Sequence, residues 1–559
     1  MNGRIFRVAD LVVDALVIHG VDRAFGVPGE SFLALLDALH GRDEVDFVTC
    51  RHESGASLAA IADAKLTGRA GVAMVSRGPG AFNAGLGVHV ASQEAVPLVL
   101  LVGQVDLPNL KRDAVQEIDT TRAFGGLLKW SARIDRADHA PEILARAFSA
   151  ALSGTPGPVA VELPEDVLEM AADGLEARCH SVAHPEPSLA AAERAAGLIG
   201  AAKRPVLLIG GECRSEAFRE DLLALSERWN VPVAVAAKMQ DQFPNDHTLW
   251  IGQLGFFISP AQVALFDQAD LFVALGTRLG ELSSLGFRFP RQEPPRQRLI
   301  HIYPDPGAIG TRFHADVPVV ASAHSFVRSM LGLPGAPRRR PDWLEAVTRT
   351  REAAHGWPER AVPDADVLGH AVAAVARIFP DNGIITTDSG NFAAWVHRIF
   401  RLKTSARLLG SACGAMGSGV PSAIAAGLRH PDRKVVAFCG DGGFLMTGNE
   451  LATAVARRLE VKIVISNNRS YGTIRSYQEK AFPDRSSGTD LCNPDFAALA
   501  QAFGASGYVV ETAAGAAETI TKAMSQKGPV VIEVVCDVRQ TLERSLVAAR
   551  QATLAATLP

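Results

Sequence analysis

Short apolar runs alternate with longer amphipathic stretches along almost the whole chain. One such run, residues 96–102, follows a polar stretch that includes Glu94 and ends at Gly103. It is too short to cross a bilayer and is typical of a strand buried on both faces. Because similar runs alternate with helical patterns from end to end, the sequence predicts an α/β fold with parallel sheets.

At 559 residues the chain is too long for a single hydrophobic core. Two stretches rich in proline, glycine and charge divide it, residues 184–188 and residues 333–343. The predicted domains are residues 1–180, 190–333 and 345–540. We interpret the run Arg338, Arg339, Arg340 as a solvated linker and expect a terminal helix after Arg539; no short internal repeat is visible.

Composition is ordinary for a globular protein, with 48% apolar and 21% charged residues. A net charge of −4 offers no basic field for nucleic acid, so we expect no nucleic-acid partner. Asp10 and Asp14 indicate that the first apolar stretch is an amphipathic helix rather than a secretory signal, and no run suits a membrane. The seven scattered cysteines, without a CxxC pair, are interpreted as reduced core thiols of a cytoplasmic protein.

Two predicted strands end in residues that suit a metal and a phosphate. Residues 434–439 run into Gly440, Asp441, Gly442 and Gly443, and residues 461–466 end at Asn467 and Asn468. A helical stretch over residues 449–459 connects them, so both strand ends should meet at one edge of a parallel sheet. Oxygen atoms of Asp441, Asn468 and the Ser470 carbonyl, beside the backbone of Gly442, Gly443 and Gly472, predict Mg²⁺ carrying a diphosphate.

This constellation resembles the signature of thiamine-diphosphate-dependent enzymes, and the resemblance covers about residues 5–540. It is closest to the acetolactate synthase-like branch, which also includes 2-oxoacid decarboxylases and carboligases. The resemblance implies three doubly wound parallel-sheet domains: an N-terminal pyrimidine-binding domain, a central domain and a C-terminal diphosphate-binding domain. It implies thiamine diphosphate and Mg²⁺ as cofactors.

Glu53 follows an expected strand, residues 45–50, and opens an expected helix. A carboxylate in the first turn of a helix is ordinary capping and dipole chemistry, which is the structural alternative. The resemblance implies that Glu53 is instead the activating glutamate. Bonded to the pyrimidine N1′, it would favour the 4′-imino form, whose nitrogen can take the C2 proton.

The glycines between Gly410 and Gly419 follow the order GxxGxG, and no ribose-binding acid stands at the expected offset. The stretch therefore does not match a dinucleotide fingerprint. In the family pattern Met416 would prop the cofactor in its bent form, and the backbone at Gly414 and Met416 would bond the pyrimidine. Met416 as a simple core residue is the alternative.

Near the N-terminus, the resemblance places the turn containing Gly26 and Glu30 over the cofactor of a partner subunit. Glu30 would relay protons near the substrate, or would be only an exposed loop carboxylate. Gln116 matches a segment of the synthases, but its neighbour Val115 replaces their aromatic residue. That departure puts the usual acceptor pocket in doubt.

Further residues complete the cofactor site implied by the resemblance. Tyr471 would cover the thiazolium. Gly390, Asn391 and Phe392 would form a second diphosphate-contacting loop, with an ordinary strand-to-helix turn as the alternative. Ile474 stands where pyruvate decarboxylases carry a glutamate and Tyr477 where the synthases place a tryptophan, so both predict an altered substrate.

The central domain leaves FAD open as a further cofactor. Synthases of this branch bind FAD there, and Gly210, Gly211, Gly276 and Arg278 fit that pattern. Tyr303 does not fit, because the FAD-binding relatives carry an aspartate at that place.

The predicted activity is decarboxylation of a 2-oxoacid such as pyruvate, followed by carboligation of the enamine to an acceptor carbonyl. The alternatives are a non-ligating decarboxylase or C–C lyase, a nicotinamide-dependent oxidoreductase, which the missing fingerprint disfavours, and a non-catalytic regulatory homologue, which Glu53 disfavours. Because Glu53 and Asp441 lie in different predicted domains, the family arrangement implies a site between subunits. We expect a homodimer as the minimum and a homotetramer as the assembly.

Overall fold

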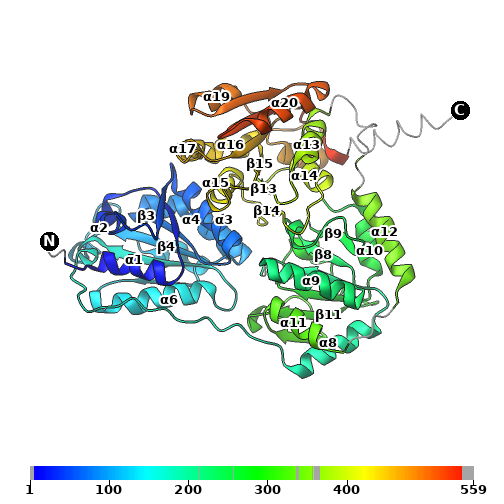
Figure 1. Cartoon of the computed structure of the whole chain (residues 1–559), viewed down its shortest axis with the longest axis horizontal. Coiled ribbons are helices and arrows are strands. Elements are labelled where there is room, and N and C mark those ends of the chain that lie inside the picture. Colours follow the sequence, from blue (N-terminus) through cyan, green and yellow to red (C-terminus); the bar gives the residue numbers. More distant parts are fainter. Residues whose placement is uncertain are drawn as a thin grey trace. The chain divides into compact units, whose positions relative to one another are not determined.

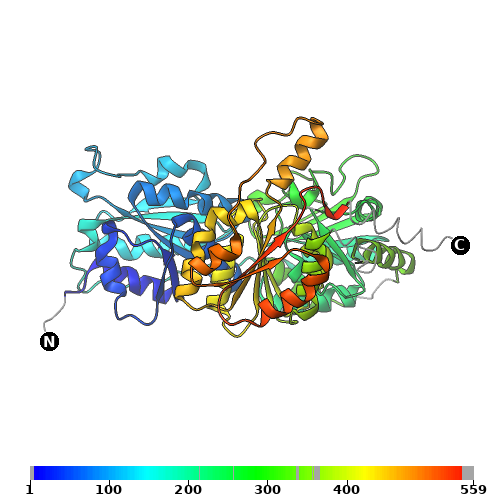
Figure 2. The same ribbon diagram turned by 90° about the horizontal axis from the view of Figure 1, so that it is seen from above.

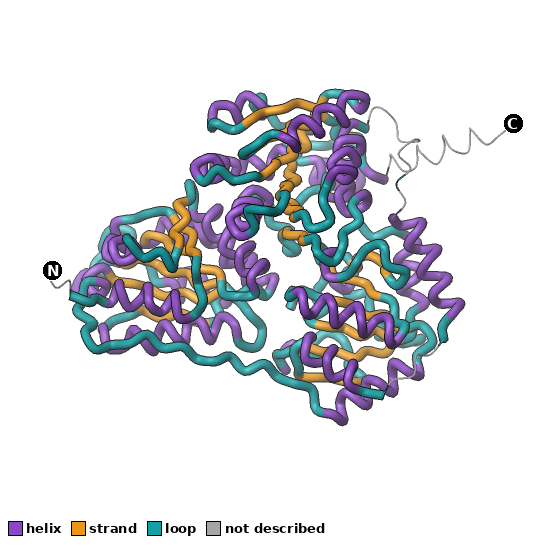
Figure 3. Tube along the Cα trace, in the orientation of Figure 1, coloured by secondary structure: helices purple, strands orange, loops and turns teal. Residues whose placement is uncertain are grey.

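The computed structural model describes residues 5–212, 214–255, 257–334, 339–355, 357 and 366–543. Its strands form three six-stranded sheets, and the paired strands of each sheet run parallel (Figures 1 and 3). Helices flank each sheet, so the predicted fold class of three doubly wound parallel-sheet domains is confirmed.

The first sheet has the strand order β2-β1-β3-β4-β6-β5. Its strands are β1 (Arg23–Gly26), β2 (Asp46–Thr49), β3 (Gly71–Ser76), β4 (Leu98–Gln104), β5 (Trp130–Arg133) and β6 (Pro158–Pro164). Its helices are α1 (Val8–Ile18), α2 (Leu33–Leu39), α3 (Glu53–Thr67), α4 (Arg77–Glu94), α5 (Thr120–Phe124), α6 (Ala140–Leu152) and α7 (Glu165–Leu168).

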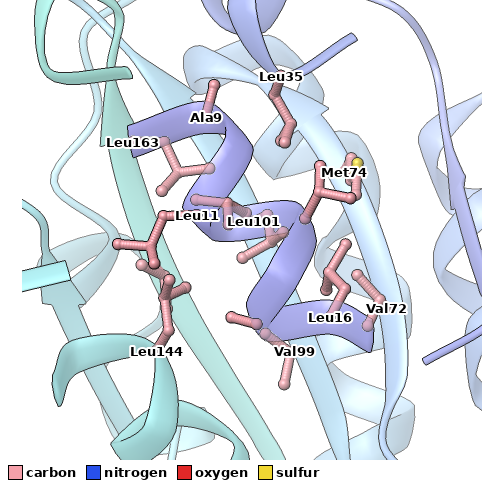
Figure 4. Packing of buried hydrophobic residues seen from close by; sticks show 14 of the residues in the cluster. Ala9, Leu11, Leu16, Leu35, Val72, Met74, Val99, Leu101, Leu144 and Leu163 are labelled. Atoms are coloured by element: carbon pink, nitrogen blue, oxygen red, sulfur yellow. The ribbon is translucent and has the colours of Figure 1, made fainter. Parts of the chain in front are cut away.

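Apolar periodicity explains how these elements pack. Strand β4 is buried at every position, as expected for a central strand covered on both faces. Leu11 and Leu16 of α1 pack against Met74 of β3 and Leu101 of β4 (Figure 4). Helices α1 and α6 lie on this face, and α3 and α4 pack together on the other (Figure 1).

The second sheet has the order β12-β11-β10-β7-β8-β9, so successive strands are added toward one edge from β7 to β9 and toward the other edge from β10 to β12, and the strand order reverses between β7 and β10. Its strands are β7 (Pro205–Ile209), β8 (Val233–Ala236), β9 (Trp250–Leu254), β10 (Leu271–Leu275), β11 (Arg298–Tyr303) and β12 (Val317–Val320). Its helices are α8 (Leu189–Ala201), α9 (Glu216–Trp229), α10 (Pro260–Gln268), α11 (Ala323–Gly332) and α12 (Pro341–His355). Two separate apolar clusters, one with α8, α9 and α11 and one with α10 and α12, cover the sheet.

The third sheet has the order β14-β13-β15-β16-β18-β17. Its strands are β13 (Ile384–Thr387), β14 (Arg407–Gly410), β15 (Val435–Gly440), β16 (Val461–Asn467), β17 (Ser506–Val510) and β18 (Val530–Val535). The helices of this part of the chain are α13 (Val367–Ile378), α14 (Ala393–Ile399), α15 (Gly419–Arg429), α16 (Asp441–Thr447), α17 (Leu451–Ala456), α18 (Gly472–Ala481), α19 (Phe496–Ala502) and α20 (Ala513–Ser525). The helical stretch expected over residues 449–459 thus begins earlier, at Asp441, and is interrupted by a short 3-10 turn at Gly448–Glu450.

The first and third sheets share one topology. Numbered along the chain, both place their strands in the order second, first, third, fourth, sixth, fifth. No short sequence repeat indicates this shared strand order, because two sheets can pair their strands in the same order with different residues in the strands.

The structure divides into two compact units. The first consists of residues 1–183 with two short segments from the C-terminal region, 420–429 and 447–457, and the second contains the remaining residues. Within the first unit, Arg429 of α15 forms a bidentate pair with Asp63 of α3, with distances of 2.9 and 2.8 Å. Helix α3, which begins at Glu53 as predicted, is therefore held by residues from far along the chain.

Arg340 corrects the expectation of a solvated arginine linker. Its side chain is buried and donates to the carbonyls of Ile199, Ala202 and Trp229 at 2.7, 3.1 and 3.0 Å. These carbonyls lie at the ends of α8 and α9, where helices leave acceptors unpaired, so the guanidinium serves as a C-terminal cap for both. Arg338 lies outside the described residues, as do residues 544–559 of the expected terminal helix.

Two remaining expectations concern cysteines and membranes. Cys50 and Cys439 are buried as predicted, whereas Cys179 and Cys492 are exposed, so the core-thiol prediction is wrong for these two; Cys213 is not among the described residues. In the part of the chain that the structure describes, no helix combines the length and hydropathy that spanning a bilayer would require.

We expect Arg429→Met to destabilise the protein by about 3 kcal/mol at pH 7, because it leaves the buried Asp63 carboxylate unpaired. Burial already raises the pKa of Asp63, and loss of the guanidinium would raise it further. In the variant the carboxylate then protonates on acidification. The loss in free energy of unfolding relative to wild type should therefore shrink as the pH falls from about 7 to about 5.

Urea denaturation across this pH range measures the effect. Arg457→Met is the matched control, since Arg457 pairs with the partly exposed Asp46 at 2.8 Å and should cost no more than about 1 kcal/mol. A deficit for Arg429→Met that does not change with pH would contradict the assignment.

Candidate functional site

Asp441 and Asn468 meet at one edge of the third sheet. Strands β15 and β16 are adjacent and parallel, with Gly440 opposite Ser466 in the register. Asp441 directly follows β15, and Asn468 directly follows β16. The predicted placement of both side chains at the same carboxyl edge is confirmed, while their roles as ligands remain predictions.

The Asp441 carboxylate is buried, with 3% of the residue exposed. Its Oδ1 accepts a hydrogen bond from the Gly442 N–H at 2.9 Å, and its Oδ2 accepts one from Asn493 Nδ2 at 2.8 Å. Burial raises the pKa of Asp441, and these hydrogen bonds partly oppose that rise. A carboxylate that is costly to bury without a counter-charge is suited to a cation.

Asn493 is a site residue that sequence reasoning missed. Its Nδ2 bridges Asp441 and Asn467 Oδ1, the latter at 2.9 Å, and Asn467 Nδ2 donates to the buried Glu533 at 2.6 Å. The loop after α18 returns to β16 through a hydrogen bond from the Tyr471 N–H to the Thr489 carbonyl at 2.9 Å. The distance in sequence from the strand ends does not predict a site role for Asn493, because Asn493 reaches the site only through this folding back of the loop.

Asn468 and Ser470 form a tight turn beside the carboxylate. Asn468 Oδ1 accepts from the Ser470 N–H at 3.0 Å, and the Ser470 carbonyl accepts from the Gly472 N–H at 2.7 Å. Each oxygen has a second lone pair, so both retain the capacity to contact a metal. Clusters of three or more His, Cys, Asp or Glu side chains able to hold a metal are absent from the described residues. A metal here would therefore depend on Asp441 together with amide and carbonyl oxygens.

A cavity of about 240 Å³ opens at this edge, entirely within the second compact unit. Most residues predicted to bind the cofactor line it: Gly390, Asn391, Phe392, Gly414, Met416, Asp441, Gly442, Gly443, Asn468, Ser470, Tyr471 and Gly472. A Cβ at Gly443 would lie 2.4 Å from Asp388 Oδ2, and one at Gly442 would lie 2.5 Å from the Tyr471 ring. The glycines are thus required for backbone to form this wall, and one carboxylate among many backbone groups fits a magnesium diphosphate.

Asp388 holds the turn that carries Met416. Its buried carboxylate accepts from the Gly417 N–H at 2.9 Å and from the Ser418 N–H at 3.3 Å, while Ser389 Oγ donates to the Ala415 carbonyl at 2.9 Å. Burial raises the pKa of Asp388, and the backbone donors oppose the shift. The side chain of Asp388 therefore fixes the turn that carries Met416 in the cavity wall. Its sequence context did not indicate this role.

The central domain also contributes to the cavity. Lys238 follows β8, is 4% exposed, and donates from Nζ to the Asp388 carbonyl at 3.0 Å. Among the described residues that line the cavity, Lys238 carries the only positive charge. Phe257, Ile474 and Tyr477 are exposed apolar or aromatic residues of the same wall, and α18, orange in Figure 2, stands away from the sheet that it follows.

In the first compact unit, the beginning of α4 gathers the three predicted catalytic residues. Arg77 pairs with Glu30 at 3.3 Å, and the Gly78 N–H donates to the Gln116 carbonyl at 2.8 Å. Asn83 Nδ2 donates to Glu53 Oε2 at 2.9 Å. Sequence reasoning missed this helix start; the only available signal was the glycine–proline–glycine sequence that follows β3.

The surroundings of the three residues differ. Glu53 is half-buried, and a Cβ at Gly80 would lie 3.3 Å from its Oε1. The Glu30 side chain is 69% exposed, and Gln116 is exposed with a φ of 64°. Gly26 lies inside β1, where a Cβ would approach the Met74 carbonyl to 2.5 Å, so packing alone requires a glycine there.

Family models match most of the chain. The N-terminal TPP-binding domain of thiamine pyrophosphate enzymes matches residues 6–123, the central domain of these enzymes matches residues 192–330, and their C-terminal TPP-binding domain matches residues 388–534. These ranges contain the strands of the three sheets described above, except for β5 and β6 of the first sheet, β13 of the third and the last residue of β18.

Curated relatives resemble the chain over nearly its whole length. The acetolactate synthase large subunit of Parasynechococcus marenigrum is 33% identical, covering 94% of this chain and 87% of the relative. That of Lactococcus lactis subsp. lactis is 30% identical, covering 94% and 92%. The acetolactate synthase isozyme 2 large subunit of Escherichia coli K12 is also 30% identical, covering 96% of each chain.

We expect Asp441→Asn to weaken Mg²⁺-dependent binding of thiamine diphosphate by roughly 100-fold, since one charge-assisted contact contributes about 3 kcal/mol. Because burial raises the pKa of Asp441, binding by the wild type should weaken on acidification at a higher pH than an exposed aspartate would allow. Titration of the apoprotein by calorimetry at several pH values measures both effects.

Asp490→Asn is the control, because Asp490 lies in the neighbouring loop and is 87% exposed. Equal affinities for the two variants would contradict the assignment of Asp441 to the metal.

Proposed function

Since the chain belongs to the thiamine pyrophosphate enzyme family, in its acetolactate synthase-like branch, we propose that it decarboxylates a 2-oxoacid and ligates the remaining fragment to an acceptor carbonyl. The observation that carries the proposal is the meeting of Asp441 and Asn468 at one end of a glycine-lined cavity. The residues of that cavity fit thiamine diphosphate bound through Mg²⁺.

Bound thiamine diphosphate would supply a carbon that becomes a nucleophile toward the 2-oxoacid once its proton is lost, and a cationic ring that accepts the electron pair left behind when CO₂ departs. The first task of the protein's own residues is to hold the metal. Asp441 Oδ, Asn468 Oδ1 and the Ser470 carbonyl would hold Mg²⁺, which keeps several positions for water and phosphate. Gly390, Asn391, Gly442 and Gly443 line the cavity, and their backbone would face the diphosphate.

The shape of the cavity depends on Met416, whose bulk would hold the pyrimidine and thiazolium rings in a bent arrangement. Asp388 and Ser389 tie the turn around Met416 to the end of β13, so the backbone that carries this side chain is held in place. Such preorganisation matters because displacement of about 1 Å can cost 100-fold in rate. Tyr471 would cover the opposite side of the thiazolium.

Glu53 would hold the proton shared with the pyrimidine N1′. Its carboxylate is oriented by Asn83 and therefore presents one oxygen to a partner. Glu30 is placed by Arg77, and Gln116 by its backbone bond to Gly78. We assign to Glu30 the relay of protons near the substrate and to Gln116 a contact with it.

Glu53 and Asp441 belong to separate compact units. We propose that a homodimer, and in full a homotetramer, completes the site by bringing Glu53 of one subunit to the cavity of another. The domain bounds 1–180, 190–333 and 345–540, with pyrimidine-binding, central and diphosphate-binding roles, and a cytoplasmic location belong to the same proposal. Val115, Ile474 and Tyr477 support a preferred substrate different from that of the synthases, because they change both the acceptor side and the rim. Pyruvate serves in the test below as a simple 2-oxoacid and not as the preferred substrate.

The central sheet tests whether FAD fits. In open parallel sheets a dinucleotide binds where the strand order reverses, here between β7 and β10. Glu212 fills that crevice: its N–H donates to the Gly276 carbonyl at 3.2 Å and its Oε2 accepts from the Ala323 N–H at 3.0 Å. The Glu212 carboxylate occupies the Ala323 N–H at the start of α11, which a phosphate would otherwise use, and its negative charge repels a phosphate. The residues present therefore do not fit FAD, and we leave FAD out of the proposed cofactors.

We expect the protein with thiamine diphosphate, Mg²⁺ and pyruvate to release CO₂ and form acetolactate, and Glu53→Gln to lower turnover by at least about 100-fold. Glu142→Gln is the matched control, because Glu142 also lies in the first turn of a helix and is exposed. Acetaldehyde as the only product would contradict ligation with pyruvate, and unchanged turnover in Glu53→Gln would contradict the assigned role.

We expect the purified protein to carry no flavin absorbance and to bind no added FAD in a fluorescence titration. Glu212→Gly removes the carboxylate from the crevice and is the variant in which binding could appear. Stoichiometric flavin in the wild-type protein would show that Glu212 does not exclude it.

A further inference from the structure

Glu450 lies beside the segment that leads into Glu53, within the same compact unit. Its carboxylate is buried, with 1% of the residue exposed. Oε1 accepts hydrogen bonds from the N–H groups of Arg51 at 2.9 Å and His52 at 3.0 Å, and Oε2 accepts one from Thr453 Oγ1 at 2.7 Å. One side chain therefore satisfies the two backbone donors that immediately precede Glu53.

The other contacts at the start of α3 leave Glu53 without a capping task. His52 is the N-cap, and its Nδ1 accepts from the Ser54 N–H at 3.1 Å. A glutamate in the first turn commonly serves the unpaired donors of its own helix. Here those tasks fall to His52 and Glu450, and the Glu53 carboxylate bonds Asn83 of α4 instead.

The close approach of Glu450 depends on a glycine. A Cβ at Gly55 would lie 2.4 Å from Glu450 Oε1, so no larger residue fits at that position without displacing the carboxylate. Thr453 Oγ1 also lies 3.3 Å from the Thr49 carbonyl oxygen. The segment from Thr49 to Gly55 is thus held on one side by Glu450 and its neighbour.

We propose that Glu450 is a positioning residue for Glu53. It holds the backbone of Arg51 and His52, replaces Glu53 as the acceptor at this helix start, and so leaves the Glu53 carboxylate directed at the cofactor. The inference rests on the proposed role of Glu53. Glu450 lies in the crossover that connects β15 to β16, so the connection that follows the metal-binding Asp441 also carries the residue that aligns the activating acid.

Two measurements test this without any 2-oxoacid. Hydrogen–deuterium exchange of the apoprotein reports protection of the Arg51 and His52 amides. NMR reports the rate at which the C2 proton of thiamine diphosphate, bound with Mg²⁺, exchanges with solvent. In Glu450→Ala we expect both amides to lose protection and C2 exchange to slow by about 100-fold, while cofactor affinity stays within about threefold of wild type.

Conservative variants separate positioning from simple stabilisation. Glu450→Gln keeps an oxygen that can accept from both amides, so C2 exchange should return to within about tenfold of wild type. Glu450→Asp keeps the charge but shortens the reach, so exchange should remain slow. If Glu450→Ala does not fold, these two variants decide: exchange as fast as wild type in Glu450→Asp overturns the proposal.

Glu162 provides the matched control in the same unit. It is also buried, and its Oε1 accepts from the Thr120 N–H and hydroxyl, both at 2.8 Å. Glu162→Ala should lower the melting temperature without slowing C2 exchange. Equal slowing in Glu162→Ala and Glu450→Ala, or wild-type exchange in Glu450→Ala, would overturn the proposal.

Glu53→Gln distinguishes this inference from the proposed function. If Glu53→Gln slows C2 exchange but no 2-oxoacid is consumed, the ligation chemistry is wrong while the role of Glu450 is still decided by its own variants. If Glu53→Gln leaves C2 exchange unchanged, Glu53 is not the activating acid and the proposal for Glu450 falls with it.

Discussion

The parallel pairing of β15 with β16 is the constraint on which the candidate site depends. With Gly440 opposite Ser466, Asp441 and Asn468 leave the sheet side by side at its carboxyl edge. Both strands are buried, and a shift in register would expose apolar side chains, so the core maintains the position of the polar residues. The glycines, Asn493 and the Ser470 turn then complete an environment that suits a cation.

Buried carboxylates recur as supports in both compact units, and each accepts backbone N–H groups. Asp388 holds the turn with Met416, Glu533 anchors Asn467 and the start of α19, and Glu450 holds the segment before Glu53. Hydrogen bonds from N–H groups offset part of the desolvation of such carboxylates and make them rigid acceptors. Glu212 shows the same chemistry in the central domain, where it closes a crevice instead of opening one.

The three sheets divide into two kinds. The first and third share a strand order, and they carry the predicted activating acid and the predicted metal anchor. The second has a different order with a reversal point typical of nucleotide-binding sheets, yet Glu212 occupies it. Its contribution to the site is made elsewhere, through Lys238 and Phe257 in the wall of the cavity.

The sequence by itself determined the fold class, the strand ends at Asp441 and Asn468 and the start of α3 at Glu53, because apolar period and glycine position are local signals. It also indicated most residues of the cavity wall through the family resemblance. The tertiary structure alone decided the contacts of Asn493, Lys238 and Glu450 and the burial of Arg340, since each depends on segments distant in the chain. No local pattern specifies such contacts. The same polar residue in the same local sequence can face water or bond a distant helix, and only the folded chain decides which.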